Sequence, residues 1–338
     1  MKRKVGVLAT GLLAMLFAST VAVSQQATGS LFFANRVSGA YAAGYFDRYG
    51  DFHQTWLPGS TLFKAITSAI STPNGILVYN SSTGVGIVVQ VKDDGTTSTL
   101  TYLFSPGWDN IVSVGDYLFF YKLDGTAAVG QITADGAFTA GMSYAAGSVP
   151  RYTSVIATAN NVFLYNSADG SAATAYVYKG AFVYSQALLA GSVPTGYTYG
   201  LGLGNYVLLY NQLTGSTLIG VIDGRPGTFQ SRATATLPAG YSKLVKHGRY
   251  ALLYNPATGA STIGYVDRVS AAKFVITQQP AFSTAWTSIV STNDDLLFYN
   301  SGTGAGAAGR IDDTGKFSQT PQSLPFSAGW STVAATSR

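Results

Sequence analysis

One short motif recurs seven times along the chain at nearly constant spacing. It reads Leu-Leu-Phe-Tyr-Asn or a close variant, and successive copies of its tyrosine position are 45, 42, 44, 45, 44 and 45 residues apart. That position is occupied by Ala34, Tyr79, Tyr121, Tyr165, Tyr210, Tyr254 and Tyr299. Self-similarity at a period of roughly 20 to 50 residues indicates a repeat architecture, in which each unit packs against its neighbours.

Each copy contains four segments in the same order. An aromatic residue 13 positions before the tyrosine opens the first segment, and the motif itself is the second. The third segment follows a Gly-containing turn and ends in Gly-x-Ile/Val-Asp in several copies, and an aromatic such as Phe138 or Phe229 opens the fourth. The copy before Tyr79 is irregular, because it offers Phe63 with an apparent three-residue insertion.

Four short segments joined by tight turns predict an antiparallel meander of four strands. All 15 acidic residues are Asp, and the chain has 39 Gly and 22 Tyr, a balance that favours strands and turns over helices. A single such unit leaves both of its faces unburied, so the units must stack around an axis. The sequence therefore predicts an all-β, seven-bladed propeller of four-stranded antiparallel blades.

The chain begins with a second segment at Leu31 and ends with a first segment at Trp330 to Ala334. We expect these two segments to share one blade. The ring is then closed when the C-terminal strand pairs with the N-terminal strands, which covers edges that would otherwise aggregate.

The first 24 residues differ from the rest. Lys2, Arg3 and Lys4 precede an apolar and small-residue run from Val5 to Val23, a pattern typical of a signal peptide cleaved after Ser24. A retained membrane anchor is the alternative. Residues 25–338 are expected to form the single propeller domain, with no stable membrane insertion. Loss of the three leading cations lowers the formal charge from +5 to +2, which argues against nucleic acid as a partner.

The chain contains no cysteine. An exported protein without disulfides fits a bacterial source better than an animal one, so we expect a secreted or cell-envelope protein, periplasmic or extracellular. The fold must be held by burial alone.

No catalytic constellation stands out. His53 and His247 lie in different repeats, and no Cys or Glu accompanies them, which argues against zinc and against a Ser-His-Asp triad. Adjacent carboxylates occur at Asp93/Asp94, Asp294/Asp295 and Asp312/Asp313. Neighbouring side chains on a strand point to opposite faces, and Asp in turns accepts backbone hydrogen bonds. We therefore expect no enzyme activity, no cofactor and no metal.

The aromatic that opens each copy is the best candidate for ligand binding. The candidates are Trp108, Tyr152, Tyr197, Tyr241, Trp286 and Trp330, and four of them directly follow a glycine. An aromatic ring can stack on the apolar face of a sugar while polar neighbours fix its hydroxyl groups. A residue repeated in every blade is also what packing between blades requires, so both roles remain open.

The run from Gly107-Trp108 to Leu118-Phe119-Phe120 resembles the blades of the tachylectin-type propeller lectins. Through the predicted closure, Gly329-Trp330 continues to Leu31-Phe32-Phe33 in the same way. The resemblance implies multivalent binding of acetylated amino sugars between blades. Those lectins commonly have five blades, whereas this chain has seven copies and often has Tyr in place of Trp.

These observations predict a secreted, multivalent, lectin-like propeller that binds glycans or cell-surface polysaccharide. The alternative is an extracellular scaffold that binds surface proteins without binding sugar, because propellers host many unrelated functions.

Overall fold

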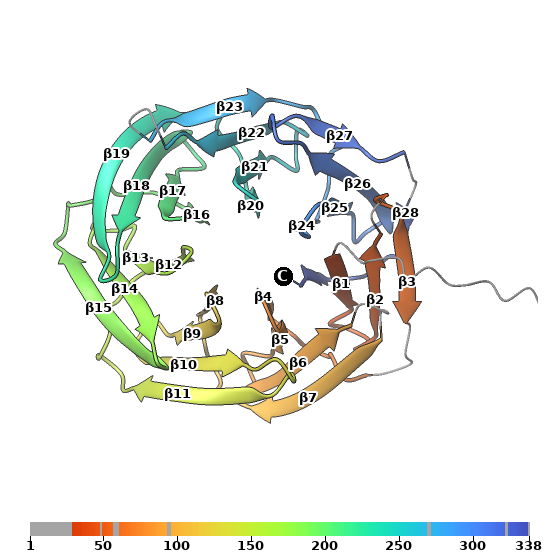
Figure 1. The fold of residues 1–338 in the computed structure, drawn as a ribbon, viewed down its shortest axis with the longest axis horizontal. Coiled ribbons are helices and arrows are strands. Elements are labelled where there is room, and N and C mark those ends of the chain that lie inside the picture. The colour runs from red at the N-terminus through yellow and green to blue at the C-terminus, as the bar shows by residue number, and fades with distance from the viewer. Residues whose placement is uncertain are drawn as a thin grey trace, which may run out of the picture.

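A computed structural model describes residues 29–47, 49–56, 61–92, 96–268, 272–321 and 324–336 of the chain. Every regular element among these residues is a β-strand, and the strands form a ring around a central axis (Figure 1). Seven antiparallel blades of four principal strands make up the ring, so the predicted seven-bladed β-propeller is confirmed. The expected leader, residues 1–24, lies outside the described residues.

In each blade the first strand lies nearest the axis and the fourth lies at the rim (Figure 1). From the axis outward, the strands are, in blade 1, β29 (Thr332–Ala335), β1 (Gly29–Ala34), β2 (Tyr41–Phe46) and β3 (Phe52–Trp56); in blade 2, β4 (Ser68–Thr72), β5 (Gly75–Tyr79), β6 (Val85–Val91) and β7 (Thr97–Leu103); in blade 3, β8 (Asn110–Val114), β9 (Tyr117–Tyr121), β10 (Ala127–Ile132) and β11 (Phe138–Tyr144); in blade 4, β12 (Ser154–Ala157), β13 (Val162–Tyr165), β14 (Ala172–Tyr178) and β15 (Ala181–Leu188); in blade 5, β16 (Tyr199–Leu203), β17 (Tyr206–Tyr210), β18 (Ser216–Asp223) and β19 (Thr228–Thr236); in blade 6, β20 (Lys243–His247), β21 (Tyr250–Tyr254), β22 (Ser261–Val266) and β23 (Phe274–Gln278); and in blade 7, β24 (Ser288–Ser291), β25 (Leu296–Tyr299), β26 (Ala305–Ile311) and β27 (Phe317–Gln319), with β28 (Leu324–Pro325) also paired to β26.

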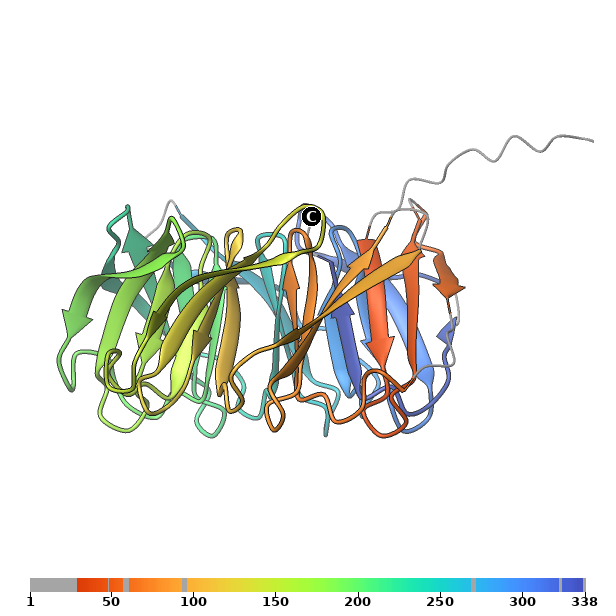
Figure 2. The same ribbon diagram turned by 90° about the horizontal axis from the view of Figure 1, so that it is seen from below.

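The strands cross the thickness of the ring, so its turns fall on two opposite faces (Figure 2). We call the face that carries the turns between first and second strands, and between third and fourth strands, the hairpin face. The opposite face, which carries the turns between second and third strands and the connections between blades, is the linker face.

The two ends of the described chain meet in blade 1. Strand β29 pairs antiparallel with β1, with Thr332 opposite Ala34 and Ala335 opposite Leu31. The backbone N–H of Thr336 donates to the carbonyl of Ser30 at 2.9 Å and extends the pairing. The predicted closure is therefore confirmed, and it gives the inner strand of blade 1 a partner without a disulfide.

The second strand of each blade explains the repeated motif. Its side chains point alternately to the two neighbouring blades, because successive residues of a strand face opposite sides of the sheet. In β13, Val162 and Leu164 pack in the cluster shared with blade 3, whereas Phe163 and Tyr165 pack in the cluster shared with blade 5. Both sides are buried, so the motif is apolar at consecutive positions instead of alternating.

The aromatic that opens the fourth strand packs over a glycine of the third strand. A β-carbon on Gly220 would clash with the ring of Phe229, and one on Gly309 would clash with the ring of Phe317. The register between β18 and β19 shifts by one residue next to this glycine, which marks a β-bulge. The Gly-x-Ile/Val-Asp pattern therefore records a packing requirement at the rim of the blade.

The expected insertion before Tyr79 is wrong. Ile66, not Phe63, stands 13 residues before Tyr79 and is buried in the equivalent place. The N–H of Thr67 donates to the Tyr79 carbonyl at 2.8 Å, as the N–H of Asp109 does to Tyr121 in the next blade at 3.1 Å. The first strand of blade 2 is therefore in register. An aromatic was expected at the column position, and an isoleucine fills it.

Phe63 instead belongs to the connection that enters blade 2. Its N–H donates to the Gly39 carbonyl at 3.3 Å, as the N–H of Phe104 does to Gly84 at 2.8 Å. The Phe63 ring is fully buried, and its centroid lies 4.5 Å from that of Tyr41.

Blade 1 also inverts the cross-strand pair that contains the tyrosine column. In the other blades the tyrosine of the second strand faces a small residue of the third, as Tyr121 faces Ala127 and Tyr299 faces Gly306. In blade 1 the small residue, Ala34, is on the second strand and faces Tyr41 on the third. The ring volume at this joint is retained, but it comes from the neighbouring strand.

Candidate functional site

The structure places all six predicted ligand-binding aromatics in the linker-face end of the joints between blades. Each lies just before the innermost strand of its blade, and none is more than 9% exposed. Trp108 packs against Phe120 with ring centroids 5.6 Å apart, and Trp330 packs against Phe33 at 6.2 Å. The column fills the core between blades, and only its edges reach solvent.

The tyrosines of the repeated motif bind the same joints through their hydroxyl groups. Each hydroxyl donates to a carbonyl in the connection to the next blade, with examples at 2.9 Å from Tyr121 to Pro150 and 2.7 Å from Tyr254 to Ser283. The same hydroxyl accepts the N–H of the column aromatic. The pairs with this second bond are Trp108 to Tyr79, Tyr152 to Tyr121, Tyr241 to Tyr210, Trp286 to Tyr254 and Trp330 to Tyr299, at 2.7 to 3.4 Å.

This arrangement makes the tyrosine hydroxyls structural groups. Burial raises the pKa of the hydroxyl in every motif tyrosine, so each stays protonated at neutral pH and can donate. A buried hydroxyl that both donates and accepts leaves little hydrogen-bonding capacity for a ligand. Sugar binding by the six aromatics themselves stays a prediction that concerns their exposed edges.

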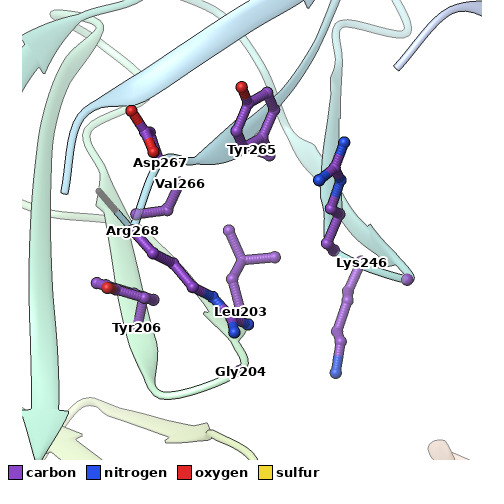
Figure 3. Close-up of a pocket in the computed structure, with 10 residues that line it drawn as sticks. Leu203, Gly204, Tyr206, Lys246, Tyr265, Val266, Asp267 and Arg268 are labelled. Carbon is purple, nitrogen blue, oxygen red and sulfur yellow. The ribbon is translucent and has the colours of Figure 1, made fainter. Parts of the chain in front are cut away.

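The most open pocket of the hairpin face lies between blades 5 and 6. It has a volume of about 540 Å³, within the range of small-ligand sites. Its polar and aromatic lining consists of Tyr206, Lys246, Arg249, Tyr265, Asp267 and Arg268. We call it the 5/6 cleft. Figure 3 shows Tyr265, Lys246 and Arg268 around the hollow, with the Arg268 side chain extending toward Gly204 of blade 5.

The sequence folds so that the 5/6 cleft draws on two blades. Tyr206 opens β17 in blade 5, whereas Lys246 is on β20 and Tyr265 on β22 in blade 6. Arg249 lies in the turn between β20 and β21, and its guanidinium carbon lies 4.9 Å from the ring centroids of both Tyr250 and Tyr265. Cation–π contacts of this kind hold the guanidinium against the cleft wall.

A smaller cleft of about 290 Å³ occupies the equivalent place between blades 1 and 2. The strand registers put Gln90 at the position of Tyr265 and Asn74 at that of Arg249. Gln90 Nε2 donates to the carbonyls of Asn74 at 3.1 Å and Ala134 at 3.0 Å. We call it the 1/2 cleft. The same site in the repeat therefore has an amide lining at one joint and an aromatic, cationic lining at another.

A third pocket, of about 260 Å³, lies between blades 3 and 4 and includes Gln131, Tyr117 and Lys179. Gln131 occupies the same repeat position as Tyr265. Pockets on the hairpin face thus recur around the ring, although their linings differ.

The histidines and the paired carboxylates are held in local interactions. His53 Nε2 lies 3.0 Å from a carboxylate oxygen of Asp47, and His247 Nδ1 lies 2.9 Å from the Ser291 hydroxyl. Asp295 is fully buried and 2.7 Å from Arg310 Nε, whereas its neighbour Asp294 is exposed.

Asp312 accepts the backbone N–H groups of Thr314 and Lys316, as expected for a turn aspartate. Asp93 and Asp94 lie outside the described residues. Within the described part of the chain, no group of three or more His, Cys, Asp or Glu side chains could hold a metal ion.

The residues of the 5/6 cleft were not singled out from the sequence. Lys246, Arg249 and Arg268 fall within 23 positions of one another in a chain with only 10% charged residues. That local excess of cations was the available signal. It was not sufficient, because Tyr206 comes from another repeat and nothing in the local pattern places it opposite Tyr265.

Comparison with solved structures supports the class defined by the fold, the seven-bladed β-propellers. The chain is similar to a provisionally assigned 6-phosphogluconolactonase from Bacteroides fragilis, with 14% identity, a TM-score of 0.63 and coverage of 91% of this chain and 98% of that one. It is similar to apo AztD from Citrobacter koseri, with 11% identity, a TM-score of 0.62 and coverage of 91% and 98%. A Lactobacillus plantarum protein matches at 17% identity and a TM-score of 0.63, with coverage of 91% and 99%.

These likenesses show the fold alone, because all three identities are low. No protein-family model matches the chain, and no curated protein matches it. In the described part of the chain, no helix is long and apolar enough to cross a membrane.

Proposed function

We propose that the chain is a carbohydrate-binding propeller with sites in the clefts between blades on its hairpin face. The observation that carries the proposal is the 5/6 cleft, which combines two tyrosine rings, Tyr206 and Tyr265, with several hydrogen-bonding side chains. Rings of this kind stack on the apolar face of a sugar, while polar groups bind its hydroxyls. The volume of about 540 Å³ suits one or two sugar rings.

The recurrence of the cleft supports multivalent binding. The 1/2 cleft uses the same repeat positions and presents the amide side chains of Asn74 and Gln90. Several weak sites on one ring raise the apparent affinity for a polysaccharide, because each further contact is intramolecular. With the leader expected at residues 1–24, the proposed ligands are extracellular glycans or cell-surface polysaccharide.

The resemblance to tachylectin-type lectins belongs to the same proposal. It concerns the blade framework, in which Trp108 and its equivalents are packed between blades. We place the principal sugar contacts at the hairpin-face clefts and leave the linker-face edges of the column as secondary contacts. We propose no catalytic role, and an assay that found robust hydrolysis of lactones or glycosides would contradict this.

The test is glycan-array binding by the full chain, followed by titration of the best ligand. The variant Tyr265→Ala removes a ring from the 5/6 cleft and should weaken binding at least tenfold while the protein remains folded. Tyr178→Ala is the matched control, because it removes a half-exposed tyrosine of blade 4 that does not line the 5/6 cleft. Silence across a broad array by the folded protein would contradict the proposal.

A protein-binding scaffold is the second candidate, and the linker face favours it. Four apolar side chains there, Val37, Leu103, Leu189 and Leu213, are each at least 80% exposed. They come from blades 1, 2, 4 and 5, and exposed apolar groups of this kind can contact a protein partner. Capture of a cell-surface protein that persists in excess sugar, and that is lost in a Leu189→Ser/Leu213→Ser variant, would support this candidate over the first.

A further inference from the structure

We infer that the 5/6 cleft selects acidic sugars, and that its ligand is a carbohydrate carrying a carboxylate, such as a uronic acid unit of a polysaccharide. The inference rests on the proposed carbohydrate-binding function and adds the chemical class of the ligand. It concerns one cleft of the ring only.

The charge of the lining carries the inference. Three cationic side chains, Lys246, Arg249 and Arg268, line the cleft together with one acidic side chain, Asp267. The rest of the chain is close to neutral, since the whole sequence has 20 cationic and 15 acidic residues. An excess of two positive charges in one hollow attracts an anionic ligand and disfavours a cationic one.

The three cations have different tasks. Arg249 Nη2 donates to the Tyr250 hydroxyl at 2.8 Å and to the Asp313 carbonyl at 2.7 Å, so this guanidinium ties blade 6 to blade 7. The Asp313 carboxylate lies near the same guanidinium but does not line the cleft. Arg249 therefore contributes positive charge and a rigid wall.

Lys246 and Arg268 are the groups placed to contact the ligand. Both side chains are exposed, and both line the cleft. Arg268 reaches across the joint, because a β-carbon built on Gly204 of blade 5 would lie 3.3 Å from Arg268 Nη2 (Figure 3). A guanidinium can bind a carboxylate through two parallel hydrogen bonds, and an ammonium adds a point charge.

The tyrosines distinguish a sugar acid from a simple anion. Tyr206 and Tyr265 come from facing blades and are both partly exposed in the cleft. Stacking on a ring requires a ligand with an apolar face, which an inorganic anion lacks. The combination of flat rings and cations matches a pyranose that carries a carboxylate.

The 1/2 cleft provides an internal comparison. Asn74 and Gln90 take the places of Arg249 and Tyr265, and the residues that line it include no charged side chain. Amide groups bind neutral sugar hydroxyls. We therefore expect unlike sites on one ring, of which the 5/6 cleft alone recognises acid groups.

The test compares two probes that differ only in charge. Oligogalacturonate and its fully methyl-esterified form are titrated into the full chain by calorimetry, with inorganic sulfate as a third probe. We expect the acid to bind about tenfold more tightly than the ester, and we expect this preference to shrink as salt rises from about 0.05 to 0.5 M, since exposed charges are screened.

The variants Arg268→Gln and Lys246→Gln should each reduce the preference for the acid, and Arg268→Lys should recover part of it. Arg232→Gln is the control, because Arg232 forms a surface ion pair with Asp223 at 3.5 Å and does not line the cleft. Both substituted cleft residues are exposed, so the variants should fold.

The remaining outcomes separate the two claims. Equal binding of acid and ester would overturn the inference and leave the proposed function in place. Sulfate binding as tight as that of the acid would also overturn it, because the site would then be a plain anion site. If neither oligosaccharide binds and the glycan array is silent, the proposed function itself fails and the inference fails with it.

Discussion

The hydroxyl of Tyr299 accepts the backbone N–H of Trp330 at 3.1 Å and donates to the carbonyl of Ser327 at 2.9 Å. Tyr299 belongs to blade 7, and Trp330 leads into the inner strand of blade 1. The joint that closes the ring therefore uses the same hydroxyl contact as the joints between blades that follow one another directly along the chain. The contact is a repeated device that a chain without cysteine uses at its seam.

Tyr299→Phe should destabilise the closing joint while keeping the ring volume. The buried N–H of Trp330 would lose its acceptor, at a cost of about 1 to 2 kcal/mol in the free energy of unfolding. Urea denaturation measures the loss. Tyr178→Phe, at a half-exposed tyrosine, is the control and should change the free energy of unfolding by less than about 0.5 kcal/mol. Equal effects of the two substitutions would contradict the structural role of the hydroxyl.

Truncation after Gly329 should abolish cooperative unfolding or cause aggregation. The truncated chain loses β29 and exposes the edge of β1, which pairs with it from Leu31 to Ala34. A chain ending at Thr336 retains every one of these pairs and should melt like the full chain. Thermal unfolding followed by circular dichroism compares the two, and identical melting would refute closure through β29.

The column tryptophans should act on stability first. Trp108, Trp286 and Trp330 are at most 9% exposed, so each substitution by alanine should cost about 3 to 5 kcal/mol and lower the melting temperature. Glycan binding by the folded fraction then reports on the edges of the rings. Wild-type melting together with wild-type binding in all three variants would contradict both roles considered for this column.

The inverted pair of blade 1 predicts a coupled double substitution. Tyr41→Ala should cost about 3 to 5 kcal/mol by opening a cavity, and Ala34→Tyr should cost about 1 to 3 kcal/mol by overpacking. Combined, the two changes restore the arrangement of the other blades, so the double variant should be more stable than the sum of the single effects predicts. A double-mutant cycle measured by denaturation gives the coupling energy. Simple additivity would show that the two residues do not share the same space.

His247 should make stability depend on pH. Burial lowers the pKa of its imidazole, and this outweighs the attraction of Asp295 and Asp294, which raises it. The unfolded chain therefore binds a proton at about pH 6.5, where the folded chain does not, so the melting temperature should fall as the pH is lowered through that value. His247→Asn should flatten this dependence between pH 7 and pH 5. An unchanged slope in the variant would assign the dependence to other groups.

Most of the fold follows from local pattern. The spacing of Tyr79, Tyr121 and their equivalents counts the blades, because each blade is a local meander whose strands and turns are adjacent in the chain. The shared blade follows from the order of segments at the two ends, at Leu31 and Trp330. The irregular copy was misread because Phe63, although aromatic, belongs to the connection, and the register depends on backbone pairing at Thr67.

The function of a repeated aromatic is not a local property. Trp108 could have faced solvent or a neighbouring blade with the same spacing, and only the packing of blade 2 against blade 3 shows that it is buried. The 5/6 cleft depends on the same relation between blades, since Tyr206 and Tyr265 are 59 residues apart and meet across a joint. The sequence by itself determined the number of blades and the closure, because strand pairing repeats locally. The tertiary structure alone decided which side chains are core and which line a cleft, because that depends on how neighbouring blades stack around the axis.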